Sequence, residues 1–229
     1  MATSGTTAFN LDLLEIIEEA FERCGSESRT GYDLRTARRS LNLLFADWAN
    51  RGINLWTLDS GAIPLVSGTA VYTLPDSTVD VLDCVIRSNT GVVATQNDRP
   101  LTRVSASTYS ATPNKLSAGF PNQMVVTRGA TAPIVTLWPV PNDSTQLLVY
   151  WRLRRIQDAG AAGAETYDIP FRLLPALASG LAYYLAFKIP NAGERLSTLK
   201  TVYEEDWQRA SDEDRERAAV RFVPRIARV

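Results

Sequence analysis

The chain has 229 residues, of which 45% are hydrophobic and 21% charged, and its formal net charge is −1. This length suits one large domain or two small ones with a buried core. The near-zero charge excludes a uniformly basic surface of the kind that neutralises nucleic-acid phosphates. No apolar run approaches the ~20 residues that span a bilayer, and residues 1–9 lack the basic and apolar regions of a signal peptide.

The sequence contains no histidine and only two cysteines, Cys24 and Cys84. Because histidine is the commonest general base and metal ligand, its absence excludes a Ser-His-Asp triad and any histidine-containing zinc site. Two thiols cannot complete a structural zinc site without other ligands. We expect two buried free thiols, with a disulfide as the alternative, synthesis in a reducing compartment, and no cofactor.

Two helices are predicted near the start of the chain. The first covers about 11–24, with Asn10 as its N-cap and Gly25 just past its end. The second covers about 32–50. Helical spacing predicts that these residues are buried: Leu13, Ile16, Ile17, Ala20, Phe21, Cys24, Leu34, Ala37, Leu41, Leu44, Phe45 and Trp48. The opposite face of the second helix carries Arg35, Arg38, Arg39, Asn42 and Asp47.

The region 54–155 has short apolar runs between turn residues, a pattern typical of strands. Strands are predicted at 70–74, 79–87, 100–104, 123–128, 134–138 and 147–154. Their spacing favours a small sandwich or barrel. Residues 105–110 are predicted to form a single helical turn.

Helical periodicity returns after a small-residue insert at 158–165. A third helix is predicted from Phe171 to Lys188, with Pro175 either in its first turn or kinking it. Gly180 lies among alanines in this helix, a pattern that lets another helix approach closely. A fourth helix is predicted at about 192–218.

The predicted class is therefore α+β. Residues 10–53 and 168–216 are expected to form a four-helix domain, and residues 54–157 a β-rich module inserted into it. Both ends of the module must return to the helices, which favours an insertion over a separate linked domain. Residues 217–229 are expected to extend from the helices as an arm.

Charge changes sign near the C-terminus. Six acidic residues lie between Glu204 and Asp214 with only Arg209 against them, and five arginines follow from Arg215 onward. One interpretation is a solvated helix face followed by a disordered tail. Acidic residues followed by basic residues also suit the helix dipole. The other is an arm that docks on a partner.

The composition of residues 217–229 favours the docking arm. Ordering 13 residues costs roughly 1–2 kcal/mol each in backbone entropy. Burial of Phe222, Val223, Ile226 and Val229 returns only about 1.5–3 kcal/mol each. The arm is therefore expected to be a docking arm that stays disordered until a partner supplies backbone hydrogen bonds or carboxylates for its arginines.

No sequence pattern predicts an active site. The glycines at 160 and 163 lack the lysine of a phosphate-binding loop and the spacing of a dinucleotide fingerprint. Carboxylates recur on two predicted helices, at 15–22 and 204–206, but on faces expected to be exposed. We therefore do not assign them a catalytic role.

Four patterns, in order, resemble the head-to-tail adaptor proteins of short-tailed bacteriophages. The first is ARRSLNLL at 37–44 leading to DWANRGINLW at 47–56. The second is YTLP at 72–75 before the strand at 79–86. The third is LWPVPN at 137–142 before LLVYW at 147–151, and the fourth is IPF at 169–171 before LASGLAYYLA at 177–186.

The resemblance implies a ring of 12 copies that docks on the portal, carries the next tail or nozzle protein and surrounds the passing double-stranded DNA. The arm would dock on the portal through Arg217, Arg221, Phe222, Val223, Pro224, Arg225, Ile226, Arg228 and Val229. A ring needs two different faces on each subunit. The candidates are Arg35, Arg38 and Arg39 on one copy and Glu204, Glu205 and Asp206 on the next.

We expect a structural virion protein, made in the host cytoplasm and placed at the head-to-tail junction, with no enzymatic activity and no membrane contact. DNA would pass through without sequence recognition, because a near-neutral chain does not bind the DNA phosphates strongly. The alternative is another neck or tail ring or an assembly protein of the virion. A cell-wall hydrolase is the less favoured third class.

Overall fold

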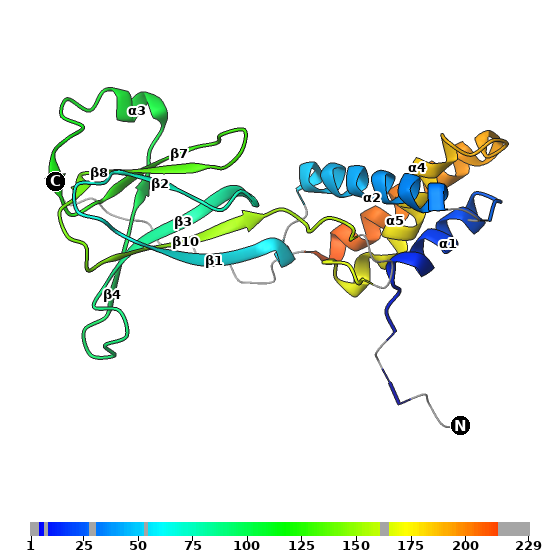
Figure 1. Ribbon diagram of the computed structural model, residues 1–229, viewed down its shortest axis with the longest axis horizontal. Helices are drawn as coiled ribbons and strands as arrows, with labels where there is room; N and C mark the ends of the chain where they lie inside the picture. The colour runs from blue at the N-terminus through cyan, green and yellow to red at the C-terminus, as the bar shows by residue number, and fades with distance from the viewer. Residues whose placement is uncertain (1–4, 7–8, 28–30, 53–54, 161–164, 215–229) are drawn as a thin grey trace. The chain divides into compact units, whose positions relative to one another are not determined.

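The computed structural model describes residues 5–6, 9–27, 31–52, 55–160 and 165–214 and divides into two compact units (Figure 1). The helical unit takes its described residues from Met1–Trp56 and Gln157–Val229, and the β unit is Thr57–Ile156. The combination of helices and sheets confirms the predicted α+β class.

The helical unit contains four α-helices and three short 3₁₀ turns among its described residues. The α-helices are α1 (Leu13–Arg23), α2 (Gly31–Arg51), α4 (Leu174–Ala186) and α5 (Leu196–Glu213). The turns are η1 (Leu55–Thr57, which reaches the first residue of the β unit), η2 (Phe171–Leu173) and η3 (Gly193–Arg195).

Helix α1 begins two residues later than predicted. Its N-cap is Asp12, not Asn10: the Asp12 carboxylate accepts from the Glu15 amide at 2.9 Å, and the Glu15 carboxylate accepts from the Asp12 amide at 2.8 Å. This capping box gives hydrogen-bond acceptors to the amides of Asp12 and Glu15, which have no carbonyl partner within the helix. The predicted end is confirmed, because Gly25 adopts φ +77° and its amide donates to the Glu22 carbonyl.

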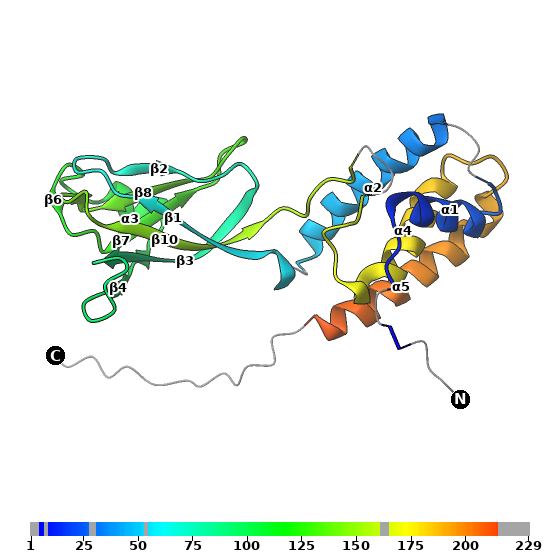
Figure 2. The same ribbon diagram turned by 60° about the horizontal axis from the view of Figure 1, so that its bottom comes forward.

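Helix α4 is the central helix of the helical unit. It packs against α1, α2 and α5 (Figure 2), and nearly all of its residues are buried, as expected for a helix that is apolar all round. Pro175 lies in its first turn, where the missing amide hydrogen costs little. A Cβ atom on Gly180 would lie 2.8 Å from the Tyr203 ring and 3.0 Å from Leu44, so glycine permits this close packing.

The β unit contains two four-stranded sheets, a two-stranded pair and one short helix. The first sheet has the order β1 (Leu58–Pro64), β10 (Leu147–Arg154), β3 (Thr78–Ser88), β4 (Asn97–Pro100). The second has the order β2 (Val71–Thr73), β8 (Ile134–Trp138), β7 (Gln123–Thr127), β5 (Thr102–Arg103). Strands β6 (Ala118–Gly119) and β9 (Val140–Pro141) pair in parallel, and α3 (Ala106–Ser110) is the predicted helical turn.

The two large sheets share one hydrophobic core. Val81, Ile86 and Leu148 come from the first sheet and Val135 and Leu137 from the second, and all five are fully buried. Neither sheet closes on itself within the described strands. The β unit is therefore two packed open sheets, which favours the sandwich over the barrel among the predicted alternatives.

The strands of the β unit differ from the prediction in three respects, the first of which is that the short pair β6–β9 was not predicted. Strand β1 was not predicted, and it contains Gly61, whose Cβ would lie 2.3 Å from the Tyr150 hydroxyl. The single strand predicted at 100–104 is instead two, since β4 pairs with β3 and β5 pairs with β7. The chain changes sheets at Leu101, which is buried between them.

Candidate functional site

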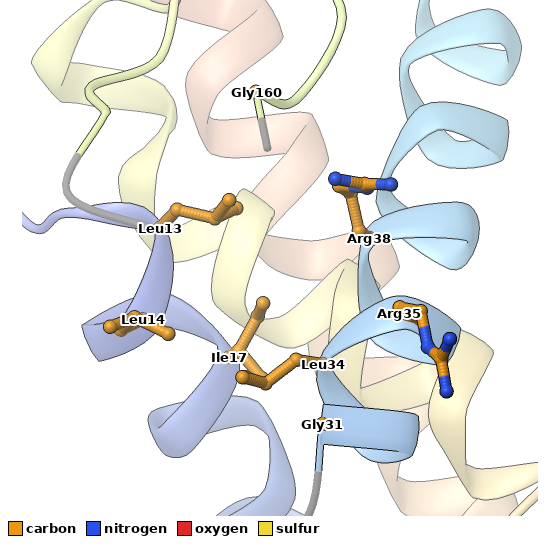
Figure 3. A pocket seen from close by; sticks show the side chains of 8 residues that line it. All are labelled: Leu13, Leu14, Ile17, Gly31, Leu34, Arg35, Arg38 and Gly160. Atoms are coloured by element: carbon orange, nitrogen blue, oxygen red, sulfur yellow. The ribbon is translucent and has the colours of Figure 1, made fainter. Parts of the chain in front are cut away.

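Three arginines form a basic face on the first half of α2. Arg35 and Arg39 are exposed and Arg38 is half-buried. Arg35 and Arg38 line a hollow of about 220 Å³ whose apolar side chains include Ile17 from α1 and Leu34 from α2 (Figure 3). The structure thus brings the three predicted arginines together, and no carboxylate of the described residues forms an ion pair with them.

The three predicted carboxylates lie on α5 and already have partners in their own chain. Glu204 is bound by both terminal nitrogens of Arg51, at 2.9 and 3.1 Å. Glu205 and Asp206 each accept from Arg209, at 3.4 and 3.3 Å. Within one chain, these carboxylates therefore do not meet the arginines of α2.

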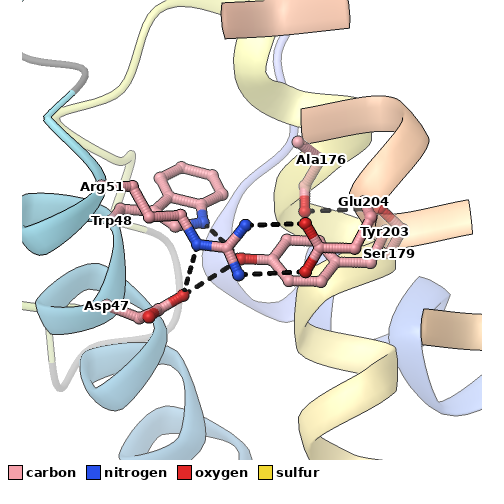
Figure 4. A network of polar contacts seen from close by, with 7 residues as sticks. All are labelled: Asp47, Trp48, Arg51, Ala176, Ser179, Tyr203 and Glu204. Carbon is pink, nitrogen blue, oxygen red and sulfur yellow. Dashed lines mark hydrogen bonds and ion pairs between the residues drawn. The ribbon is translucent and has the colours of Figure 1, made fainter. Parts of the chain in front are cut away.

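Arg51 is the centre of a junction between α2 and α5 (Figure 4). Its Nε donates to the Asp47 carboxylate at 2.9 Å, and its guanidinium lies 5.1 Å from the ring centres of both Tyr203 and Trp207. Such stacking of a cation on aromatic rings adds to the bidentate bond with Glu204. The arginine therefore joins the two helices through charge and through ring contact.

The aromatic part of this junction is buried. Trp48 has no exposed surface, donates from Nε1 to the Tyr203 hydroxyl at 3.0 Å, and packs 5.0 Å from Trp207. Burial raises the pKa of Tyr203. The hydrogen bonds from Arg51 lower the pKa of the Glu204 carboxyl, and the same bonds raise the pKa of Arg51. The ion pair thus stays charged over the neutral range.

Sequence reasoning did not identify Arg51 as a key residue. The four-residue spacing from Asp47 to Arg51 was visible as a helical ion pair. However, Glu204 lies 153 positions away, and only the fold brings it to Arg51.

Both cysteines are buried free thiols, as expected. Cys24 donates to the Ala182 carbonyl at 3.2 Å, and Cys84 belongs to the core of the β unit. Burial raises the pKa of Cys24 to about 11 and that of Cys84 to about 12. Neither thiol has the lowered pKa of a nucleophilic cysteine.

The predicted docking arm lies outside the described residues, which end at Asp214. Within the described residues, no group of three histidine, cysteine, aspartate or glutamate side chains is placed to hold a metal ion. In the same part of the chain, none of the helices has both the length and the apolar character needed to cross a membrane.

The main features of the helical unit, among the described residues, are its charged helix faces and its arginine–aromatic junction. The model of the SU10 adaptor protein family matches residues 11–227, and the chain belongs to this family. The family comprises structural adaptors of bacteriophages and is not an enzyme family, so the predicted resemblance to phage adaptors is confirmed. A search of curated proteins found no match.

Proposed function

We propose that this chain is the subunit of a ring, 12 copies in number, that joins the portal to the tail of a bacteriophage and extends the DNA channel. Membership of the SU10 adaptor family is the observation that carries this proposal. An adaptor assembles with portal and tail proteins, and the free basic face of α2 leaves surface for such contacts.

Each ring interface joins two different faces of neighbouring subunits. We assign one face to Arg35, Arg38 and Arg39 and the other to Glu204, Glu205 and Asp206. Glu205 is the most accessible of these carboxylates, since its side chain is 59% exposed, whereas that of Asp206 is 13% exposed. Arg209 holds both weakly, so an arginine of the next copy can replace it.

We assign different binding partners to the helical domain, the inserted module and the arm. The helices of residues 10–53 and 168–216 act as a four-helix domain that builds the ring and meets the portal. The inserted module, residues 54–157, is left available for contact with the next tail or nozzle protein. Residues 217–229 reach the portal as the docking arm. Double-stranded DNA passes through the lumen without base contacts, since the chain has a net charge of −1.

Charge reversal across the proposed interface tests the ring. Arg39→Glu should weaken assembly of rings on the purified portal. Adding Glu205→Arg should restore assembly, because the two opposite charges then face each other again with their positions swapped. Arg155→Glu, which reverses another exposed arginine in the β unit, is the control. Ring formation is measured by sedimentation and electron microscopy. Full assembly of the Arg39→Glu variant would refute this interface.

Removal of residues 217–229 tests the arm. The shortened chain should keep its fold, as judged by circular dichroism, but should no longer bind the portal stably. Twelve weak arms on one ring give avidity that a single arm lacks, so the loss should be large. Normal assembly of particles with the shortened chain would contradict the portal-docking role.

A further inference from the structure

An open groove of about 550 Å³ lies in the helical unit between α1 and the start of α4. Phe9, Leu11, Phe171 and Leu174 give it an apolar floor. Phe9 and Phe171 pack edge to face with ring centres 6.3 Å apart, yet they are 65% and 66% exposed. Two aromatic rings that remain this exposed are expected to have a partner that covers them.

The wall of the groove is acidic. Glu15, Glu18, Glu19 and Glu22 follow one another along one face of α1. Glu15 caps the helix and Glu19 binds Arg23 at 2.7 Å. The side chains of Glu18 and Glu22 are exposed, and their carboxylates form no hydrogen bond or ion pair within the described residues. The wall therefore offers two free carboxylates beside the apolar floor.

The last residue that the structure describes lies next to a residue that lines this groove. This last residue, Asp214, forms an ion pair with Arg172, which lines the groove, and α5 packs against η2. Residues 217–229 follow Asp214 after a connection of only two residues. Fully extended, they reach roughly 43–47 Å, whereas the stretch of α1 from Glu15 to Glu22 is about 10 Å long.

We propose that residues 217–229 of the same chain occupy this groove before the adaptor meets the portal. Phe222 and Ile226 would cover the aromatic floor, and Arg221 and Arg225 would pair with Glu18 and Glu22. The groove thus supplies the carboxylates that the sequence of the arm requires. Because this connection is only two residues long, the effective concentration of the arm at the groove would be in the millimolar range, so even a weak contact is populated.

The arm would then have two alternative binding sites, the groove of its own subunit and the portal. An arm held on its own subunit is covered, and portal binding must displace it from the groove. The adaptor subunit would therefore keep its arginine-rich and apolar segment away from other partners until the portal competes for it. This contact lies outside the portal-docking role and is tested without any portal.

The test uses the full chain with a nitroxide on the cysteine introduced by Ala227→Cys. Cys24 and Cys84 are buried and their thiols resist deprotonation, so the label attaches to the new cysteine. Amide spectra of the isotopically labelled chain should show loss of signal intensity along α1 and at the start of α4. The intensity should recover in high salt as the charge pairs are screened.

Two kinds of variant locate the contact. Glu18→Lys with Glu22→Lys should restore the α1 signals, and so should Arg221→Glu with Arg225→Glu, which changes only the arm. The matched control is Glu194→Lys with Asp76→Lys, two exposed carboxylates that do not line the groove, which should leave the signal loss unchanged. No signal loss along α1, or a loss that persists in the charge-reversed variants, would overturn the proposal.

A mixed sample distinguishes the same chain from a neighbouring copy. Isotopically labelled chains without nitroxide are mixed with unlabelled chains that carry it. If the arm binds its own subunit, the α1 signals keep their full intensity in the mixture. Signal loss that appears only in the mixture would assign the groove to the arm of another copy and would overturn the proposal as stated.

Discussion

The helical unit and the β unit differ in how their charged side chains are used. In the β unit the arginines mostly bind carboxylates of that unit: Arg87 binds Asp98 at 2.7 Å, Arg152 binds Asp59 at 3.0 Å, and Arg103 binds Asp80 at 3.1 Å. In the helical unit Arg39, Glu18 and Glu22 have no such partner within the described residues. The helical unit therefore has more unsatisfied charge to offer to other proteins.

The two cores also differ. The helical unit places a central helix rich in small residues against large aromatic side chains, with Gly180 beneath Tyr203. The β unit packs aliphatic side chains of two sheets face to face. Each unit thus has its own hydrophobic core, which predicts that damage to one core acts mainly on that unit.

The largest effect is expected at the aromatic junction. Trp48→Ala removes a fully buried ring and its hydrogen bond to Tyr203, and should lower the free energy of unfolding of the helical unit by about 3–5 kcal/mol. Hydrogen exchange of α4 and α5 amides measures the loss. Trp151→Ala, which removes a 39% exposed ring from β10, is the control and should cost less. Equal losses would contradict this account of the core.

The corresponding change in the β unit is Leu137→Ala. Leu137 is fully buried between the sheets, so its truncation should destabilise the β unit by about 2–5 kcal/mol. Amide spectra along a urea titration report each unit separately, and α4 should unfold at an unchanged urea concentration. Leu116→Ala, at an 85% exposed position, should have little effect. Joint unfolding of both units would show that their stabilities are coupled.

A smaller effect is expected where helices approach closely. Gly180→Ala introduces a Cβ 2.8 Å from the Tyr203 ring, and overpacking of this kind costs about 1–3 kcal/mol. Alanine recovers about 1 kcal/mol through its higher helix propensity, so we expect a modest net loss in urea unfolding. Gly193→Ala meets no atom within 4 Å and should be neutral or slightly stabilising. A stabilised Gly180→Ala variant would contradict the close packing.

The smallest effect concerns the Arg51–Glu204 pair, whose side chains are 27% and 46% exposed. The hydrogen bonds from Arg51 lower the pKa of Glu204 below the ordinary value for a glutamate. The pair therefore stabilises the fold above that ordinary pKa, and its contribution is lost as the pH falls through the lowered pKa. Glu204→Gln should cost about 0.2–1 kcal/mol at pH 7 and almost nothing in acid. Urea titrations at both pH values measure this.

Glu205→Gln is the matched control for that measurement. It removes the same charge from the same helix, but within the part of the chain that the structure describes its carboxylate is held only by Arg209, at 3.4 Å. We expect a smaller change at pH 7 than for Glu204→Gln. If Glu204→Gln costs the same at both pH values, the ion pair is not the source of its effect.

Features that depend on neighbouring residues were predicted well. The strands at 134–138 and 147–154 have the predicted bounds, and the glycine at the end of α1 has the left-handed conformation that its position required. The family was also recognised from the order of short patterns. The N-cap of α1 was wrong by two residues, because Asn10 and Asp12 are both good caps and only Asp12 has Glu15 three positions later.

By itself, the sequence determined the α+β class, the order of the four long helices and of most strands, and most of the buried helix stripes, with Leu34 half-buried as an exception, because periodicity and turn chemistry act over a few residues. Only the tertiary structure decided that Gly61 lies in an edge strand beneath Tyr150, that the chain changes sheets at Leu101, and that Arg51 binds Glu204. Each of these depends on residues far apart in the chain. Their meeting is set by how the cores pack, which no local pattern records.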